Sequence, residues 1–521
     1  MKSDSKLPIL LIILISIPIF IGALDLTVVS AVLPHVIMDL EIPLQTGLDN
    51  AAWMVTGYLL AYSISMTFMG RLSDLIGRKK VFLWALGIFM LGSYLVAVSD
   101  GWPTNLALRI YYMFANGRPD ISFVTLDVLI ISRMIQAFGA GTMVPVGMAV
   151  VSDLYPSGKR AKPLGIIAAV DTTGWVVGHL YGGIIVKSWD WRVIFWLNIP
   201  ICLIAFGLIY FMMKSKEEVR SAGKMDWIGA GLIALSLTLL NIGLGSGSDT
   251  STSSKFGESG GLSEYLVPLL VSALIFFILF IWRQRTAKYP LIKLSLFKRK
   301  NILPANIANL LVGISLFIAI ANVPIFINSL VAETVEQGAW DSGWMLSALT
   351  VPMAFAAVPG GWLTERKGYR IPSIFGLVLA ITGFILMSTW TAETQYLTMI
   401  PHLILTGIGF GMTMAPISAA VINSSPEGHR GTSSALVILF RLVGMTIGVS
   451  GITTYDLRRA EALNLSLISD NSPISEIVQT GLQVIEQVIS ETFLIAGAII
   501  VLAILLMLLL RTPNEGSKNY D

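Results

Sequence analysis

The chain has 521 residues, of which 55% are hydrophobic and only 13% are charged, and its formal net charge is +3. Soluble globular proteins carry about 25% charged residues, so this composition excludes a soluble globular fold and indicates a polytopic helical membrane protein. The single cysteine, Cys202, excludes an internal disulfide framework and a metal site built from several cysteines.

Fourteen apolar stretches are long enough to cross a bilayer as helices, since about 20 apolar residues rising 1.5 Å each span about 30 Å of hydrocarbon. They lie at approximately 8–34, 48–70, 80–98, 122–152, 163–186, 192–213, 226–245, 264–282, 303–328, 343–363, 372–390, 399–422, 431–453 and 488–510. An even number of spans places both termini on one side. The loops on that side hold 26 of the 35 Lys and Arg residues, against 7 on the other side. The positive-inside rule therefore predicts a multi-pass cell-membrane protein with both termini in the cytoplasm.

Two of the predicted external connections are longer than turns. The segment 99–121 contains Trp102, Tyr111, Tyr112 and Phe114, which is typical of a segment at the membrane interface. A lid over a substrate site is the alternative for this segment. In the segment 454–487, a helix is expected to open at Pro473 and to run into the last span.

The chain resembles itself at nearly fixed offsets, which indicates two related halves. At an offset of 270, eight residues of the first half recur in kind: Gly139, Gly141, Ala149, Pro156, Gly158, Arg160, Gly174 and Gly178 become Gly409, Gly411, Ala419, Pro426, Gly428, Arg430, Gly444 and Gly448. At an offset of 291, Gly70, Leu72, Asp74, Gly77 and Lys79 correspond to Gly361, Leu363, Glu365, Gly368 and Arg370. The repeat predicts a six-helix half at 1–213, an inserted helix pair with a linker at 214–300, and a second six-helix half at 301–521. Transporters built from such repeats bind their substrates near the midplane between the halves.

The hydrophilic island Gly70-Arg71-Leu72-Ser73-Asp74-Leu75-Ile76-Gly77-Arg78-Lys79-Lys80 separates the second and third spans. We expect the chain to reverse direction on Gly70 and Gly77, which leaves Asp74 and Arg78 in a tight cytoplasmic loop. A plain topology-setting loop, rich in cations because it faces the cytoplasm, is the simpler interpretation.

Four ionisable residues lie well inside predicted spans: Asp25, Arg133, Asp171 and Arg441. A charge at the bilayer centre costs several kcal/mol, on the order of 3 on insertion scales, so each is a candidate functional residue. Asp171 and Arg441 occupy equivalent positions in the repeat. Asp25 or Asp171 is a candidate proton carrier, because burial raises the pKa of a carboxyl group and a nearby arginine lowers it. Fixed ion pairs that hold helices together are the alternative.

The island at 70–80 resembles the loop-2/3 signature of the major facilitator superfamily, Gly-x-x-x-Asp-x-x-Gly-Arg-Lys. Leu24-Asp25-Leu26-Thr27-Val28-Val29 and the run from Arg133 to Gly141 resemble the span-one and span-four motifs of its fourteen-span drug:proton antiporters. The resemblance implies rocker-switch export of hydrophobic or cationic small molecules in exchange for protons, and thus a role in drug resistance. It also implies that Arg133 takes part in proton transfer, that Asp74 belongs to a charge network that latches the cytoplasmic gate, and that Leu75 stands where the family has a cation.

The fifth span resembles the antiporter motif Gly-x-x-x-Gly-Pro-x-x-Gly-Gly. Its glycines are Gly174, Gly178, Gly182 and Gly183, which permit close helix packing. His179 replaces the proline, so a presumed kink is lost and a titratable group is gained. His179 is therefore a candidate proton or substrate ligand, or a hydrogen-bonded structural residue.

No phosphate-binding loop, nucleophile–base pair or metal-ligand cluster is visible in the sequence, so neither enzymatic activity, a cofactor nor direct ATP use is expected. The expected partners are a small-molecule substrate, protons and the lipid bilayer, without nucleic acid, and a monomer with the proton gradient as energy source. Two alternatives remain open: a transporter of an anionic or lipid-like metabolite with Arg441 as anion ligand, and a non-transporting membrane sensor with the same fold.

Overall fold

The structure is a computed structural model that describes residues 6–42, 44–114, 117–213, 223–245, 266–332, 334–467 and 473–511. Secondary structure in these residues is helical throughout. The α-helices are α1 (Lys6–Asp39), α2 (Leu44–Ile76), α3 (Arg78–Ala97), α4 (Trp102–Phe114), α5 (Ile121–Leu154), α6 (Ala161–Ser188), α7 (Arg192–Met212), α8 (Trp227–Gly245), α9 (Leu266–Thr286), α10 (Ile302–Phe326), α11 (Val335–Lys367), α12 (Arg370–Met387), α13 (Tyr396–Asn423), α14 (Arg430–Leu467) and α15 (Ile474–Leu508). Each of the fourteen predicted spans overlaps one of them, and α4 is the additional helix, so the all-helical prediction is confirmed.

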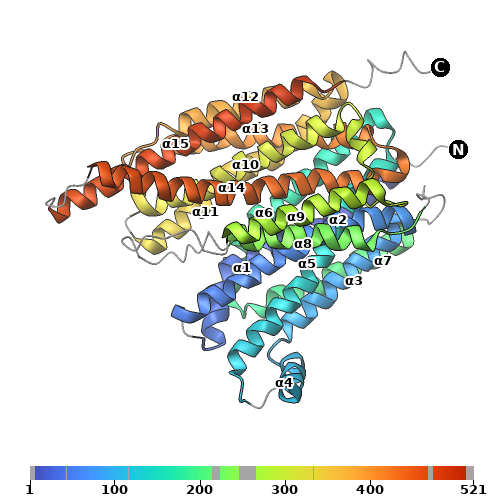
Figure 1. Cartoon of the computed structure of the whole chain (residues 1–521), viewed down its shortest axis with the longest axis horizontal. Helices are drawn as coiled ribbons and strands as arrows, with labels where there is room; N and C mark the ends of the chain where they lie inside the picture. The colour runs from blue at the N-terminus through green and yellow to red at the C-terminus, as the bar shows by residue number, and fades with distance from the viewer. Residues whose placement is uncertain are drawn as a thin grey trace.

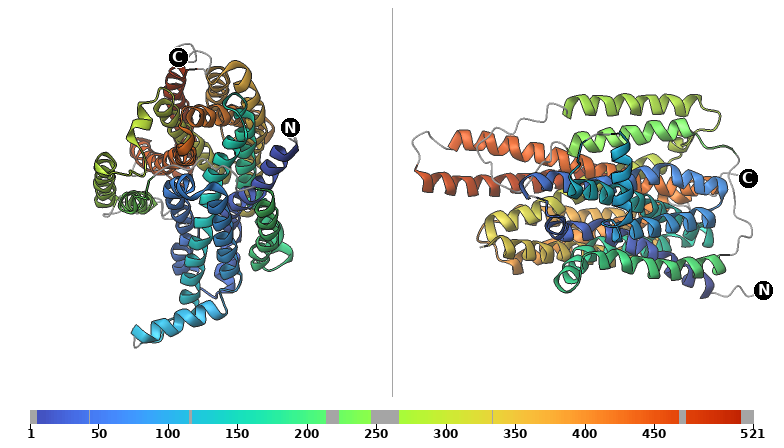
Figure 2. Two further views of the ribbon diagram at one scale, coloured as in Figure 1. Left: turned by 90° about the vertical axis from the view of Figure 1, so that its right-hand side faces the viewer. Right: turned by 90° about the horizontal axis from the view of Figure 1, so that it is seen from below.

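In the second predicted external segment, 454–487, the helix expected to open at Pro473 and to run into the last span is confirmed, whereas the beginning of the segment is wrong as a connection. α14 continues to Leu467 and α15 begins at Ile474 after Pro473, so most of this segment extends two spans. Both helices project beyond the rest of the bundle (Figures 1 and 2). Arg459 of α14 binds Glu491 of α15 through two contacts of 2.8 Å, which ties the two helices together where they leave the bundle.

The two halves repeat the same helix pairings. α1 packs on α6 as α10 packs on α14, α2 packs on α5 as α11 packs on α13, and α3 packs on α5 and α7 as α12 packs on α13 and α15. In Figure 1 the later helices, yellow to red, form one layer over the earlier, blue to teal helices. This pattern supports the repeat; the boundaries 1–213, 214–300 and 301–521 stay a prediction. Residues 214–222 and 246–265 lie outside the described residues.

The halves meet along two matching contacts, α2 with α14 and α6 with α11. The inserted pair α8 and α9 packs outside both halves where α2 and α14 meet, with Phe68 and Leu436 among its contacts (Figure 2). Eleven described helices are long and apolar enough to cross a membrane.

Two glycines let α6 approach α1 backbone to backbone. A Cβ atom at Gly174 would lie 2.6 Å from the Phe20 carbonyl, and one at Gly178 would overlap the Leu24 carbonyl. Gly182 is buried one turn further along this face. Gly183 is exposed and a Cβ there would meet no atom within 4 Å, so the predicted packing role is wrong at this position. Five residues after Gly178, a helix has turned by about 140°, away from α1.

Substitution of Gly178 by alanine should destabilise the protein, and Gly183→Ala provides the matched control on the same helix. Overpacking in a tight contact costs roughly 1–3 kcal/mol, whereas alanine in an open helical position is neutral or stabilising by up to about 1 kcal/mol. Thermal unfolding of the purified variants should therefore show a lower Tm for Gly178→Ala only. Equal Tm values would mean that α1 and α6 do not pack as closely as described.

Candidate functional site

The first buried ion pair lies within the first half, between α1 and α5. Arg133 Nη1 lies 2.6 Å from Asp25 Oδ2, and Arg133 Nη2 donates to the Asp25 backbone carbonyl at 2.9 Å. Both side chains are fully buried. Removing one partner would leave a single charge in a low-dielectric site, so each of these two residues requires the other.

Arg133 is surrounded by groups that fix its orientation. It donates to Gln136 Oε1 at 2.7 Å, and Gln136 in turn donates to Ser93 of α3 at 2.7 Å. The guanidinium carbon lies 4.2 Å from the centre of the Tyr58 ring and 5.6 Å from that of Phe195. α2 and α7 thus contact the Arg133 guanidinium through aromatic rings, and α3 acts on it indirectly by holding Gln136 in place.

The second buried ion pair joins the two halves. Arg441 Nη2 of α14 lies 3.2 Å from Asp171 Oδ2 of α6, and the side chains are 13% and 5% exposed. Asp171 Oδ1 is buried and has no hydrogen-bond partner among the described residues. The two positions that the repeat equates therefore meet across the pseudo-symmetric interface, with one carboxylate oxygen left for a proton or another donor.

Two tyrosines of α2 lie between the ion pairs, a connection that sequence reasoning missed. Tyr58 packs on Arg133 and stacks on Tyr62 at a ring separation of 6.1 Å. Tyr62, one turn further along, is within electrostatic range of Asp171 and Arg441. Aromatic residues in membrane helices are common, so only the contact with Arg133 distinguishes these two.

His179 belongs to α6, but its side chain lies outside the described residues. Its predicted role as a ligand therefore stays a prediction. No group of three or more metal-ligating side chains occurs in the part of the chain that was described.

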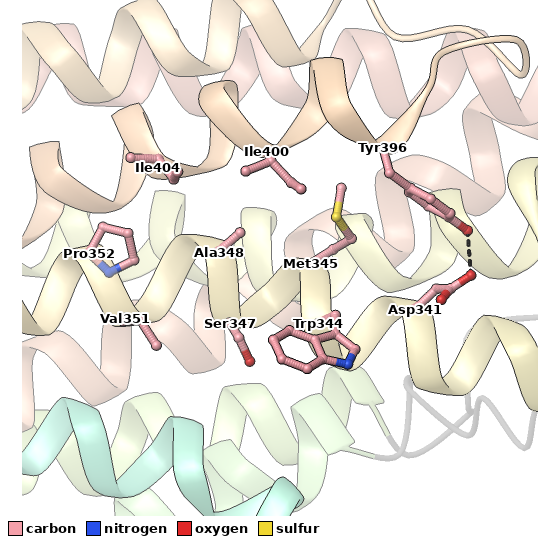
Figure 3. Close-up of a pocket in the computed structure, with 10 residues that line it drawn as sticks. All are labelled: Asp341, Trp344, Met345, Ser347, Ala348, Val351, Pro352, Tyr396, Ile400 and Ile404. Carbon is pink, nitrogen blue, oxygen red and sulfur yellow. Dashed lines mark hydrogen bonds between the residues drawn. The ribbon is translucent and has the colours of Figure 1, made fainter.

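A pocket of about 480 Å³ lies between α11 and α13, toward the ends of these helices that are remote from the chain termini. Met345 and Ala348 of α11 point toward Ile400 of α13 across it (Figure 3). At its outer end the Tyr396 hydroxyl donates to Asp341 Oδ2 at 2.7 Å. The remaining lining residues are mostly apolar: Trp344, Ser347, Val351, Pro352 and Ile404.

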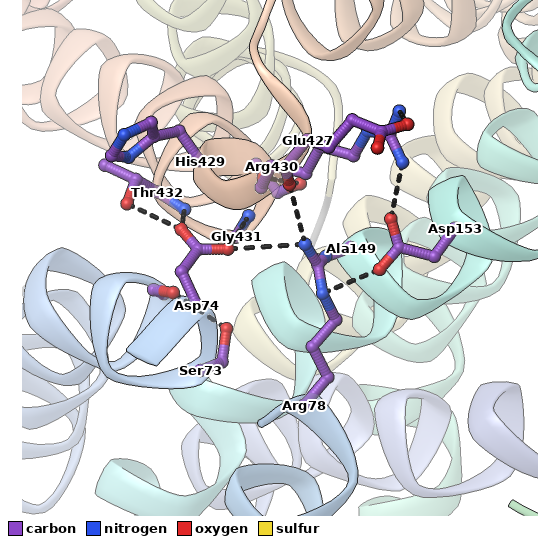
Figure 4. Close-up of polar contacts among 12 residues, drawn as sticks. Ser73, Asp74, Arg78, Ala149, Asp153, Glu427, His429, Arg430, Gly431 and Thr432 are labelled. Atoms are coloured by element: carbon purple, nitrogen blue, oxygen red, sulfur yellow. Dashed lines mark hydrogen bonds and ion pairs between the residues drawn. The ribbon is translucent and has the colours of Figure 1, made fainter. Parts of the chain in front are cut away.

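At the opposite end, where the first and last described residues lie, the halves are joined by a carboxylate that caps a helix of the other half. Asp74 of α2 is 1% exposed and accepts hydrogen bonds of 2.9 Å from the backbone N–H groups of Gly431 and Thr432 and from the Thr432 hydroxyl (Figure 4). These groups form the first turn of α14. A helix N-terminus carries partial positive charge and unpaired N–H donors, so a buried carboxylate is stable there.

The expected chain reversal at Gly70 is wrong. α2 continues to Ile76, and only Gly77, with φ of 107°, forms the turn to α3. Gly70 instead lies against Gly431, since a Cβ at either glycine would overlap the other's carbonyl oxygen. The glycine is needed because two helix backbones touch there. The polar residues between Gly70 and Gly77 can remain in α2 because they face the other half of the protein rather than lipid.

Arg78 extends the cap into a network. It lies 3.3 Å from Asp74 and 2.8 Å from Asp153, and Asp153 lies 2.7 Å from Arg430 of the second half (Figure 4). Burial and the nearby Arg430 lower the pKa of Arg160, whereas Asp153 acts in the opposite direction. The carboxylates therefore make it possible for Arg78, Arg160 and Arg430 to lie close together at this end of the interface between the halves.

A weaker copy of the cap occurs at the related interface. Glu365 of α11, the repeat counterpart of Asp74, accepts a hydrogen bond of 3.0 Å from the backbone N–H of Lys162 in the first turn of α6. Gly361, the counterpart of Gly70, lies against Ala161. Both interfaces are thus closed at the terminal end of the bundle, and the pocket lies toward the other end, an arrangement that suits one state of an alternating-access cycle.

Loss of the Asp74 charge should open the terminal end. Removal of a capping side chain costs about 1–2 kcal/mol, so Asp74→Asn should lower the closed-to-open ratio by roughly tenfold. The measurement is disulfide formation in the pair Ser157→Cys/Asn423→Cys, two residues joined across the halves by a hydrogen bond of 3.0 Å from the Asn423 side chain to the Ser157 carbonyl, in a Cys202→Ala background. The same pair with Asp190→Asn, an exposed carboxylate at the other end, is the control. An unchanged yield with Asp74→Asn would exclude the cap as the latch.

The pair Asp171–Arg441 should show strong energetic coupling. Breaking a buried ion pair costs roughly 3–5 kcal/mol because one charge stays unpaired, whereas replacing both partners by apolar residues is often neutral. Thermal unfolding should therefore show that Asp171→Leu and Arg441→Leu each destabilise the protein and that the double variant recovers most of the loss. Additive losses would contradict the pairing. The same cycle on the more exposed pair Arg459–Glu491, whose side chains are 38% and 26% exposed, should show weaker coupling.

Comparison with known proteins agrees with this architecture. The family model described as Major Facilitator Superfamily matches residues 15–449 and 306–520. The chain is similar to solved structures of a proton:xylose symporter, with TM-score 0.61, 14% identity and coverage of 97% of this chain and 96% of that one. It is likewise similar to the human organic anion transporter MFSD10, with TM-score 0.59, 12% identity and coverage of 96% and 100%. At these identities the likeness speaks to the fold alone.

Curated relatives are more similar in sequence. A protein of Mycolicibacterium smegmatis named triacylglyceride transporter is 27% identical, over 97% of this chain and 88% of its own length. A probable triacylglyceride transporter of Mycobacterium leprae is 29% identical over 96% of both chains, and one named triacylglyceride transporter in Mycobacterium tuberculosis is 29% identical over 89% and 86%. The family model agrees with the superfamily expected from the motifs, whereas the names of these relatives do not point specifically to its drug:proton antiporters. The chain belongs to the Major Facilitator Superfamily and is a membrane transporter rather than an enzyme.

Proposed function

We propose that the chain transports a lipid-like molecule with long acyl chains, of the triacylglyceride class, by proton-coupled alternating access. The observation that supports this proposal most is the apolar pocket between α11 and α13 in a chain whose relatives, aligned over most of its length, are named triacylglyceride transporters. Apolar side chains bind acyl chains by excluding water from both surfaces.

The charge balance of the bundle favours a neutral substrate. The intramembrane carboxylates Asp25 and Asp171 each lie beside an arginine. Asp341 at the outer end of the pocket is hydrogen-bonded to the uncharged Tyr396 hydroxyl, so it is the carboxylate that a cationic substrate could use. A cationic substrate needs a carboxylate that is not already neutralised, and an anionic one needs a free cation. Arg441, the candidate anion ligand, is bound to Asp171 in this state, so the lipid-like alternative fits better than the anionic one.

Proton coupling would act through Asp25. Protonation of this carboxyl group would remove the counter-charge of Arg133, which must then find another partner or move, since an unpaired buried charge is unfavourable. Tyr58 and Tyr62 lie between this pair and the Asp171–Arg441 pair that joins the halves. A change at Asp25 would thereby alter the contact that the halves must break to exchange states. The energy source in this scheme is the proton gradient.

Proton-coupled efflux of hydrophobic or cationic drugs is the second candidate. It is favoured by the exposed Trp340 and Trp344 of α11, whose ring centres lie 6.3 Å apart near the pocket. Aromatic faces attract organic cations. A sensor without transport activity would share the fold and show no flux of either substrate.

Transfer of a fluorescent triacylglycerol from proteoliposomes to albumin outside them should depend on the protein and on an imposed pH gradient. Asp25→Asn should remove the gradient dependence, since the carboxyl group can no longer exchange a proton. Ala348→Trp should block the pocket and reduce transfer severalfold, whereas Val378→Trp, an exposed position on α12, should have no effect.

The outcomes separate the candidates. Gradient-driven flux of ethidium without triacylglycerol transfer would overturn the lipid proposal in favour of drug efflux. Transfer that Asp25→Asn leaves fully gradient-dependent would remove Asp25 from the coupling path. If the purified protein unfolds cooperatively, and is therefore folded, but transports neither triacylglycerol nor ethidium, the result would favour a sensor without transport activity.

A further inference from the structure

α4 has an apolar face that the protein itself leaves uncovered. Five residues at helical spacing form this face: Trp102, Leu106, Ile110, Met113 and Phe114. Their side chains are 52%, 49%, 49%, 76% and 88% exposed. Only Pro103 and Thr104 of the helix are buried against the bundle. We call the five residues the α4 apolar face.

The direction of α4 differs from that of every helix around it. In the view along the bundle, where the spanning helices appear end-on, α4 extends sideways from the first half (Figure 2, left). Seen from below, it again lies across the bundle axis (Figure 2, right). If the other helices span a membrane, α4 is parallel to the membrane plane.

The depth of α4 follows from the helix that precedes it. α3, Arg78–Ala97, has 20 residues and a mean hydropathy of 1.8, which corresponds to about 30 Å, the thickness of the hydrocarbon layer. A short hydrogen-bonded turn follows, in which Gly101 N–H donates to the Val98 carbonyl at 3.0 Å and the Thr104 hydroxyl to Ser99 at 2.6 Å. α4 therefore begins where α3 leaves the hydrocarbon.

The chemistry of α4 fits a lipid surface better than a lid or a protein partner. It projects from the first half on the side away from α10 to α15 (Figure 1), so it does not cover the space between the halves. Its one charged residue, Arg109, lies at the edge of the α4 apolar face, from where a long side chain can reach the polar headgroups. Trp and Tyr are enriched at membrane interfaces, and helices with one apolar face lie in them.

We propose that α4 is an interfacial helix that inserts its apolar face into the lipid leaflet at the end of the bundle remote from the termini. It holds the adjoining ends of α3 and α5 at a fixed depth. Asp120 stabilises the start of α5, since its carboxylate accepts a hydrogen bond of 2.9 Å from the Ser122 N–H group and caps the helix. The first half would thus keep its depth in the bilayer while the second half tilts against it.

The chain is well suited to a test by site-specific labelling, because Cys202 is its single cysteine and is buried. In a Cys202→Ala background, the variants Leu106→Cys and Phe114→Cys place a polarity-sensitive fluorophore on the α4 apolar face. Asn105→Cys and Tyr112→Cys, two exposed positions seven residues apart on one stripe of the helix, place it away from that face as matched controls. The labelled proteins are reconstituted into phosphatidylcholine–phosphatidylglycerol vesicles, and no transported substrate is required.

Fluorophores on the α4 apolar face should emit at shorter wavelength and be quenched severalfold more by lipids brominated near the top of the acyl chain than by aqueous iodide. The two control positions should show the reverse preference. Equal quenching by iodide at all four positions would overturn the proposal in favour of a solvated helix. Protection from both quenchers at Leu106 and Phe114 would also overturn it, in favour of coverage by protein.

Discussion

A charge inside a low-dielectric bundle must have a partner, and this constraint determines how the helices are arranged. Asp25 and Arg133 fix α1 to α5 within one half, and Asp171 and Arg441 fix α6 to α14 across the halves. The first pair is fully enclosed and supported by several neighbours. The second is partly exposed and leaves one carboxylate oxygen unsatisfied. A transporter must break contacts between its halves but not within them, so the looser pair lies at the interface that has to move.

The amino-acid sequence was sufficient for the number and order of the spans, because burial in lipid requires long apolar stretches. It failed where helices are not surrounded by lipid. The polar residues 454–467 continue α14 beyond the apolar layer, and Gly70 to Ile76 continue α2 because they face the other half. An apolar stretch of sequence marks the part of a helix that lipid surrounds, not the full length of the helix. The two errors therefore have the same cause.

The candidate site was predicted in part for a similar reason. Charged residues within apolar stretches are conspicuous, and the repeat equated Asp171 with Arg441. The pairing of Asp25 with Arg133 and the cap that Asp74 forms on α14 depend on contacts between residues 108 and 357 positions apart, which no local pattern encodes. From the sequence, Tyr58 could be considered only as a cavity-lining or packing residue, because aromatic residues are common in membrane helices. Its role depends on the cation beneath its ring, which only the fold brings there.

The two caps at the terminal end differ in strength, and this asymmetry has a mechanistic consequence. Asp74 is buried, accepts three hydrogen bonds and touches Arg78, whereas Glu365 is exposed and accepts one. Charged hydrogen bonds weaken when water competes for both partners. The interface of α6 with α11 should therefore separate before that of α2 with α14. The inserted pair α8 and α9 packs beside the stronger interface, so both features leave the α6–α11 side as the easier route by which an acyl chain enters or leaves the space between the halves.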